Sequence, residues 1–61
     1  MEKILEIDKN AQDITFNPLD EDGEVQIEIQ NHYDVYRYAS IYLNKEEIKS
    51  VIEFLQNQLN D

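Results

Sequence analysis

Four carboxylates surround the only glycine of the chain, and they are the first candidates for chemistry: Asp20, Glu21, Asp22 and Glu24. Carboxylate oxygens are the ligands that Ca²⁺ prefers, and an EF-hand loop also needs glycine at its sixth position. With Gly23 in that position, Pro18 would be first and Ile29 twelfth, where the loop requires ligands. We therefore predict a solvated hairpin tip, with a weak adventitious cation site as the alternative.

A nucleophilic serine activated by a histidine would have to combine Ser40 or Ser50 with His32, because the chain has no other serine or histidine. Neither serine lies in a Gly-x-Ser-x-Gly elbow, and the chain has no second histidine and no cysteine to bind a metal beside His32. A single glycine excludes a glycine-rich phosphate loop, and so short a chain has little room for a substrate cleft. We predict that the protein is not an enzyme, that it uses no cofactor and no metal, and that His32 is a solvated turn residue.

The chain has 61 residues, which predicts a single domain over residues 1–61. A domain of this size buries only about 60% of the surface that its unfolded chain exposes, so its stability is marginal. Disulfides cannot add stability, because the chain has no cysteine. Oligomerisation is another way for a small domain to bury surface, and we therefore expect a homo-oligomer, with a homodimer as its simplest form.

The charge is one-sided, because 14 acidic and 5 basic residues give a formal net charge of −9. Such a chain repels nucleic-acid phosphates and anionic membranes, so we expect no direct binding to either. A protein partner, including a basic one, is compatible with this charge, which also has the simpler role of keeping a small protein soluble. No apolar stretch approaches the roughly 20 residues of a membrane span, and residues 1–6 lack the apolar run of a signal peptide. We expect a cytoplasmic protein.

Alternating apolar and polar residues predict four strands, over residues 3–8, 13–17, 24–30 and 33–43. The alternation is cleanest in the third, where Val25, Ile27 and Ile29 share one face. Just before it, Asp22 and Gly23 form a pair that is typical of tight hairpin turns. Short connections between strands favour antiparallel pairing.

A helix is predicted over residues 45–59, with Asn44 as its N-cap and Glu47 completing a capping box. Its apolar residues recur at three- and four-residue steps on one face: Ile48, Val51, Ile52, Leu55 and Leu59. The sequence therefore predicts an α+β fold, a small antiparallel sheet of three to four strands followed by one C-terminal helix packed on one face (β-β-β-β-α). The helix stripe and one face of the sheet form the predicted core: Leu5, Ile7, Ile14, Phe16, Val25, Ile27, Ile29, Val35, Ala39, Ile41, Leu43, Ile48, Val51, Ile52, Leu55 and Leu59.

A tyrosine-rich sheet face is the most specific indication of function. Tyr36, Tyr38 and Tyr42 are expected on the face away from the helix, and tyrosine is enriched at protein interfaces. Phe54, on the flank of the helix stripe, is a weaker indication of the same kind, and packing at the edge of the core is the favoured interpretation there. The first hypothesis is a small acidic, non-enzymatic protein–protein interaction module that self-associates through this face. Alternatively, tyrosine simply suits half-exposed strand positions.

A second hypothesis starts from acidic residues that would share one surface: Asp20, Glu21, Asp22, Glu24, Glu28 and Asp34. In size, acidity and strand–helix plan the chain resembles small proteins of phages and other mobile elements, some of which inhibit host nucleases with an acidic surface. The resemblance implies an inhibitor that mimics nucleic acid and blocks a basic groove of a host enzyme. A third hypothesis, an accessory subunit of a larger assembly, fits the composition equally well.

Overall fold

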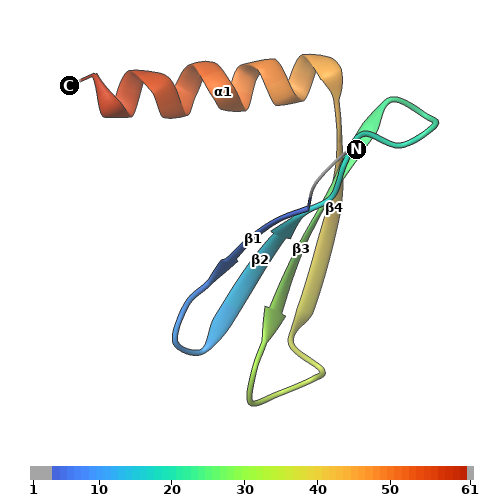
Figure 1. The fold of residues 1–61 in the computed structure, drawn as a ribbon, viewed down its shortest axis with the longest axis vertical. Coiled ribbons are helices and arrows are strands. Elements are labelled where there is room, and N and C mark those ends of the chain that lie inside the picture. The colour runs from blue at the N-terminus through green and yellow to red at the C-terminus, as the bar shows by residue number, and fades with distance from the viewer. Residues whose placement is uncertain (1–3, 61) are drawn as a thin grey trace.

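Four antiparallel strands followed by one helix make up the fold in the computed structural model, which describes residues 4–60 (Figure 1). The elements follow one another as β1 (Leu5–Asp8), β2 (Gln12–Phe16), β3 (Glu24–Asn31), β4 (Tyr38–Asn44) and α1 (Lys45–Leu59). The strands lie in the sheet in chain order, each paired with the next. The predicted α+β fold class is therefore confirmed. No helix within residues 4–60 is long and apolar enough to cross a membrane.

The strand register places the apolar residues of all four strands on one face. Ile27 lies between Phe16 of β2 and Ile41 of β4, and Val25 lies opposite Leu43. Because side chains alternate along each strand, the whole apolar face follows from these pairs: Leu5, Ile7, Ile14, Phe16, Val25, Ile27, Ile29, Ala39, Ile41 and Leu43. The opposite face carries the polar residues of β1 to β3 and the tyrosines of β4.

The turn before β3 forms where the sequence predicts it. The backbone amide of Gly23 donates to the carbonyl oxygen of Asp20 over 3.1 Å, and Gly23 adopts a φ of 78°, which glycine tolerates at least cost. A carboxylate oxygen of Asp20 also accepts from the amides of Asp22 and Glu24, both at 2.9 Å. Asp20 thus holds the turn together, which is a structural role.

The fourth strand is shorter than predicted: it begins at Tyr38, whereas the prediction began it at residue 33. A side-chain oxygen of Asn31 accepts from the amides of Tyr33 and Asp34, both at 2.9 Å. The side chain of Asp34 in turn accepts from the amide of Tyr36 at 3.0 Å. Asn and Asp compete in this way with the sheet ladder for backbone groups. The result is a tight loop instead of the first five residues of the predicted strand.

The predicted core is not closed within one chain. None of the residues that the structure describes is fully buried. Six large apolar residues of the predicted core are half-buried: Ile14, Phe16, Val25, Ile27, Leu43 and Ile48. The other large apolar residues of the predicted core are exposed. Val35 lies in the loop before β4 and is 71% exposed. One chain therefore supplies both apolar layers of an α+β core, but the two layers are not packed tightly against each other.

Candidate interaction site

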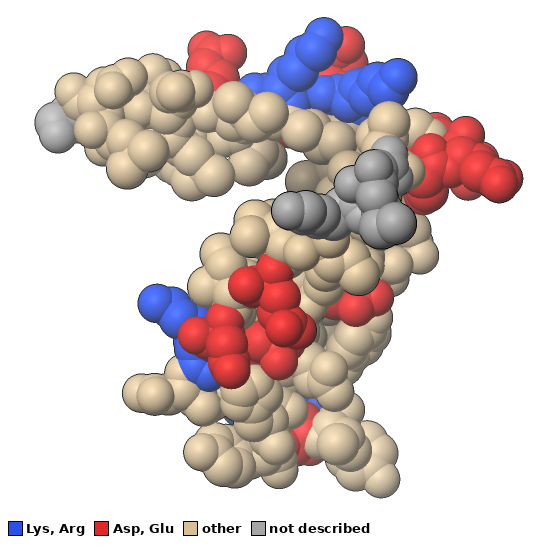
Figure 2. Space-filling model, viewed as in Figure 1, with Lys and Arg blue, Asp and Glu red and all other residues tan. Residues whose placement is uncertain are grey.

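An apolar cleft separates the helix from the sheet, and its volume is about 290 Å³. Figure 2 shows the molecule hollowed between these two elements. Every residue that lines the cleft is apolar, five from the sheet and four from the helix: Leu5, Phe16, Val25, Ile27, Leu43, Ile48, Val51, Ile52 and Leu55. Water inside gains no hydrogen bond from these side chains, so filling the cleft with apolar atoms is favourable. The apolar stripe of the helix and the apolar face of the sheet thus face each other, as predicted, but the space between them is open.

The cleft is open because no residue separates β4 from α1. Asn44 is both the last residue of β4, paired with Glu24, and the N-cap of α1. Its side chain accepts from the amide of Glu47, and the side chain of Glu47 accepts from the amide of Asn44, both at 2.9 Å. The predicted capping box is confirmed, and it fixes the direction in which the helix leaves the strand. As Figure 1 shows, α1 extends away from the strands, and its main approach to the sheet is at β4.

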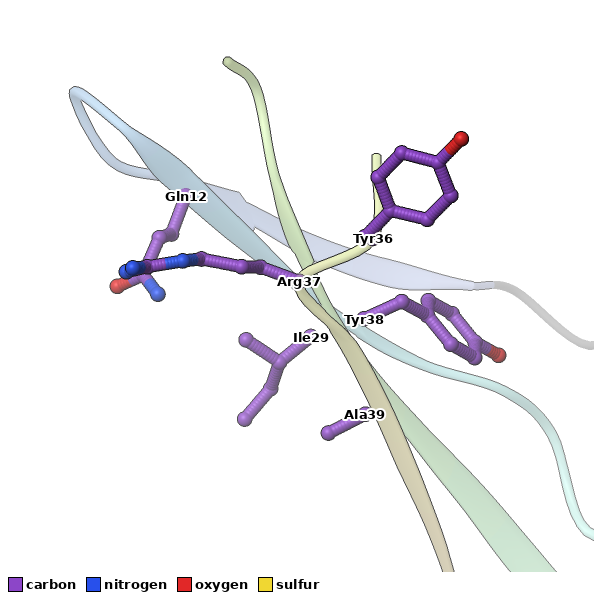
Figure 3. Close-up of a pocket in the computed structure, with 6 residues that line it drawn as sticks. All are labelled: Gln12, Ile29, Tyr36, Arg37, Tyr38 and Ala39. Carbon is purple, nitrogen blue, oxygen red and sulfur yellow. The ribbon is translucent and has the colours of Figure 1, made fainter. Parts of the chain in front are cut away.

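The tyrosines lie on the side of the sheet away from the cleft. Tyr38 and Tyr42 pair with Gln30 and Gln26, and they are 50% and 52% exposed. The prediction that Tyr36 lies in the sheet is wrong, because Tyr36 lies in the loop before β4, where it is 92% exposed. Figure 3 shows the rings of Tyr36 and Tyr38 on one side of the chain and the Arg37 side chain on the other. The three tyrosines therefore form a ragged surface, of which only Tyr38 and Tyr42 have fixed sheet positions.

Phe54 lies apart from both surfaces. It is 61% exposed, and it lines a shallow depression on the helix together with Ser50, Glu53 and Asn57. None of these four residues lines the apolar cleft. The structure thus does not join Phe54 to the tyrosines, with which the sequence analysis grouped it.

The predicted acidic residues do not form one continuous surface. Asp20, Glu21 and Asp22 lie in the turn before β3, whereas Asp34 lies beyond its other end, 3.5 Å from the guanidinium of Arg37. Only Glu24 and Glu28 belong to the tyrosine-bearing face of the sheet. The predicted set is therefore divided among two loops and one strand.

The sheet adds three carboxylates that the sequence analysis missed. Glu6 lies opposite Thr15 and Asp8 opposite Asp13, and Thr15 lies opposite Glu28. Glu6, Asp8 and Asp13 therefore share the face of Glu28. In Figure 2, acidic side chains gather over the β1–β2 part of the sheet and at the β2–β3 turn. The strand register was the missing information, because it aligns positions that are far apart in the sequence.

His32 is exposed and lies at a bend, as predicted, but it has two acidic neighbours. Its Nε2 atom is 3.0 Å from a carboxylate oxygen of Asp13 and 3.5 Å from one of Asp8. The hydrogen bond to Asp13 is the main cause that raises the pKa of His32 above its usual 6.5, and the charges of Asp8 and Asp13 add to it. One possible ligand atom from each of the three side chains lies within 4.8 Å of the other two, a spacing that a cation site could also have. The hydrogen bond between His32 and Asp13 holds two of these side chains together.

The pKa of His32 gives a measurable prediction. Because its folded-state pKa is raised, the stabilising effect of this group is complete below about pH 6.5, the unfolded value. It is lost as the pH rises through the folded-state pKa. NMR titration should find the His32 pKa above 6.5, and Asp13→Asn should lower it. Glu24→Gln, at the far end of β3, should leave it unchanged, and equal effects of both substitutions would contradict the assignment.

No family model, curated protein or solved structure matches this chain.

Proposed function

We propose that this chain is a small non-enzymatic interaction module that binds a protein surface in the apolar cleft between α1 and the sheet. The observation that carries the proposal is the cleft itself, whose lining is wholly apolar, in a chain with no fully buried residue among those described. Burying apolar surface contributes about 25 cal/mol per Å². An exposed apolar surface of this kind typically marks an interaction site.

The cleft is a better binding surface than the tyrosine face. Tyr38 and Tyr42 share their side of the sheet with five carboxylates: Glu6, Asp8, Asp13, Glu24 and Glu28. A partner that covered this face would have to remove water from those charges, which is costly unless each gains a partner. Covering the cleft removes water from apolar side chains alone. We therefore assign the principal interaction to the cleft in place of the tyrosine face.

Mimicry of nucleic acid is the second candidate, and the five carboxylates of the sheet favour it. Glu24 and Glu28 stand on the same face of β3 with Gln26 between them, so they lie about 13 Å apart, twice the spacing of alternate residues along a strand. Such a surface would bind a basic groove, with an affinity that falls steeply as salt screens the charges. The third candidate, an accessory subunit, would use the same cleft to attach to its assembly.

Site-specific photo-crosslinking in cells that produce the chain can distinguish binding in the cleft from binding at the acidic face. A benzophenone amino acid would be introduced at Ile52 in the cleft, at Asn57 outside it, or at Gln26 beside Tyr42 on the acidic face. We expect protein adducts from position 52 and few from position 57. Adducts from position 26 alone would favour the mimic. Their absence at both 52 and 26 would contradict both candidates.

A further inference from the structure

We propose that the protein that occupies the cleft is a second copy of this chain, in a two-fold symmetric dimer in which each α1 packs on the other chain's sheet. The inference rests on the proposed function, since it names the partner of the same cleft. Three properties of the chain support it: the area it exposes, the position of its uncovered apolar residues and its charge.

The exposed area is too large for a compact monomer. A folded monomer of 7.3 kDa should expose about 4,200 Å², whereas this chain exposes 5474 Å². Its radius of gyration is 13.2 Å, against about 10.5 Å expected for a compact domain of 61 residues. If each of two chains buried the excess of about 1,300 Å², the interface would total about 2,600 Å², within the range of obligate homodimers.

The uncovered parts of the two apolar layers complement each other. Leu55 and Leu59 in the second half of α1 are 54% and 85% exposed, because this part of the helix extends beyond the sheet of its own chain (Figure 1). On the sheet, Ile41 and Ile7 are 57% and 44% exposed. One chain therefore has an apolar helix end that no sheet covers and an apolar sheet region that no helix covers. In a two-fold symmetric dimer, the helix end of each chain can cover the exposed sheet region of the other, because both chains use the same surfaces.

Charge restricts how two copies can meet. Each chain carries a net charge of −9, so contact through the carboxylate-bearing sheet face would bring like charges together. The residues that line the cleft carry no charge. On the helix, Lys45, Lys49 and Glu53 fall outside the apolar stripe and stay in water when the stripe is covered. Association through the cleft therefore avoids the repulsion that association through the tyrosine face would meet.

Leu59→Glu tests the proposal, because Leu59 is 85% exposed in one chain and a change there costs a monomer little. Sedimentation equilibrium of the full chain should give about twice the mass of 7.3 kDa. Two equivalent leucines are lost per dimer, so Leu59→Glu should raise the dimer dissociation constant on the order of 100-fold or more. Asn57→Glu adds the same charge on the opposite side of the helix, and it should change the constant less than about threefold.

Each other outcome has a defined meaning. A monomer that binds an apolar dye such as anilinonaphthalene sulfonate at micromolar concentration would overturn the dimer and leave the proposed function standing. A folded monomer that binds no dye would overturn both, because the cleft would then be closed within one chain. A dimer that resists Leu59→Glu but dissociates on Tyr38→Ser would place the interface on the tyrosine face and overturn the inference. Circular dichroism of each variant would report whether loss of the dimer also unfolds the chain.

Discussion

Phe16→Ala is expected to destabilise the protein by about 3 kcal/mol or more, within the range for large aromatic residues of a closed core. Phe16 belongs to the second strand, lies opposite Ile27 and lines the cleft. Within one chain it is only half-buried, which would give a smaller loss. We expect the whole ring to be covered once a second chain fills the cleft. Urea unfolding at a fixed protein concentration, extrapolated linearly to water, measures the difference.

Tyr42→Ala is the matched control for this experiment. It also removes an aromatic ring from the sheet, but from the opposite face, where the ring is 52% exposed. We expect a loss of less than about 1 kcal/mol, typical of surface positions. If Tyr42→Ala cost as much as Phe16→Ala, the tyrosine face would be covered in solution, and the assignment of the interaction to the cleft would be wrong.

Diluting the protein 100-fold is expected to lower its thermal midpoint on the order of 10 °C. When folding and association are coupled, a 100-fold dilution removes about 2.7 kcal/mol of stability per dimer. The unfolding enthalpy of two chains of 61 residues is about 85 kcal/mol near 60 °C, and the two values together give this shift. Circular dichroism melts between about 1 and 100 μM would measure it. Asn57→Glu should shift by the same amount as the natural chain.

A midpoint independent of concentration would show that one chain folds alone, because the stability of a monomer does not depend on dilution. The salt dependence of the melts gives a second check. Burial of apolar side chains is not weakened by salt, whereas the attraction between exposed charges is screened over a distance of about 10 Å at 0.1 M salt and over shorter distances at higher salt. A midpoint that rises or holds at high salt therefore agrees with an interface in the cleft.

Local patterns were sufficient to predict the fold class. Alternation in the third strand defined the two faces of the sheet, and the single Gly23 marked the turn before it. The helix stripe and the Asn44–Glu47 capping box defined the helix and its start. These features depend on residues a few positions apart, and the sequence displays them directly.

Features that depend on distant residues could not be predicted in the same way. The cluster of His32 with Asp8 and Asp13 requires the pairing of three strands. The first five residues of the predicted fourth strand instead form a loop, because the side chains of Asn31 and Asp34 accept hydrogen bonds from backbone amides two or three residues further on. The open cleft depends on the angle between strand and helix, which the hydrophobic pattern does not contain.

The direct junction of Asn44 and Lys45 has a consequence for how this fold can change. Domain swapping occurs when a hinge is too short for an element to return to its own chain, so that the element pairs with a neighbour instead. Here the hinge has no residue of its own, because the strand ends at Asn44 and the helix begins at Lys45. A longer hinge would let the same helix lie on the same sheet within one chain. The length of this junction, more than the chemistry of either apolar layer, thus determines whether these elements encode a closed monomer or an exchanged pair.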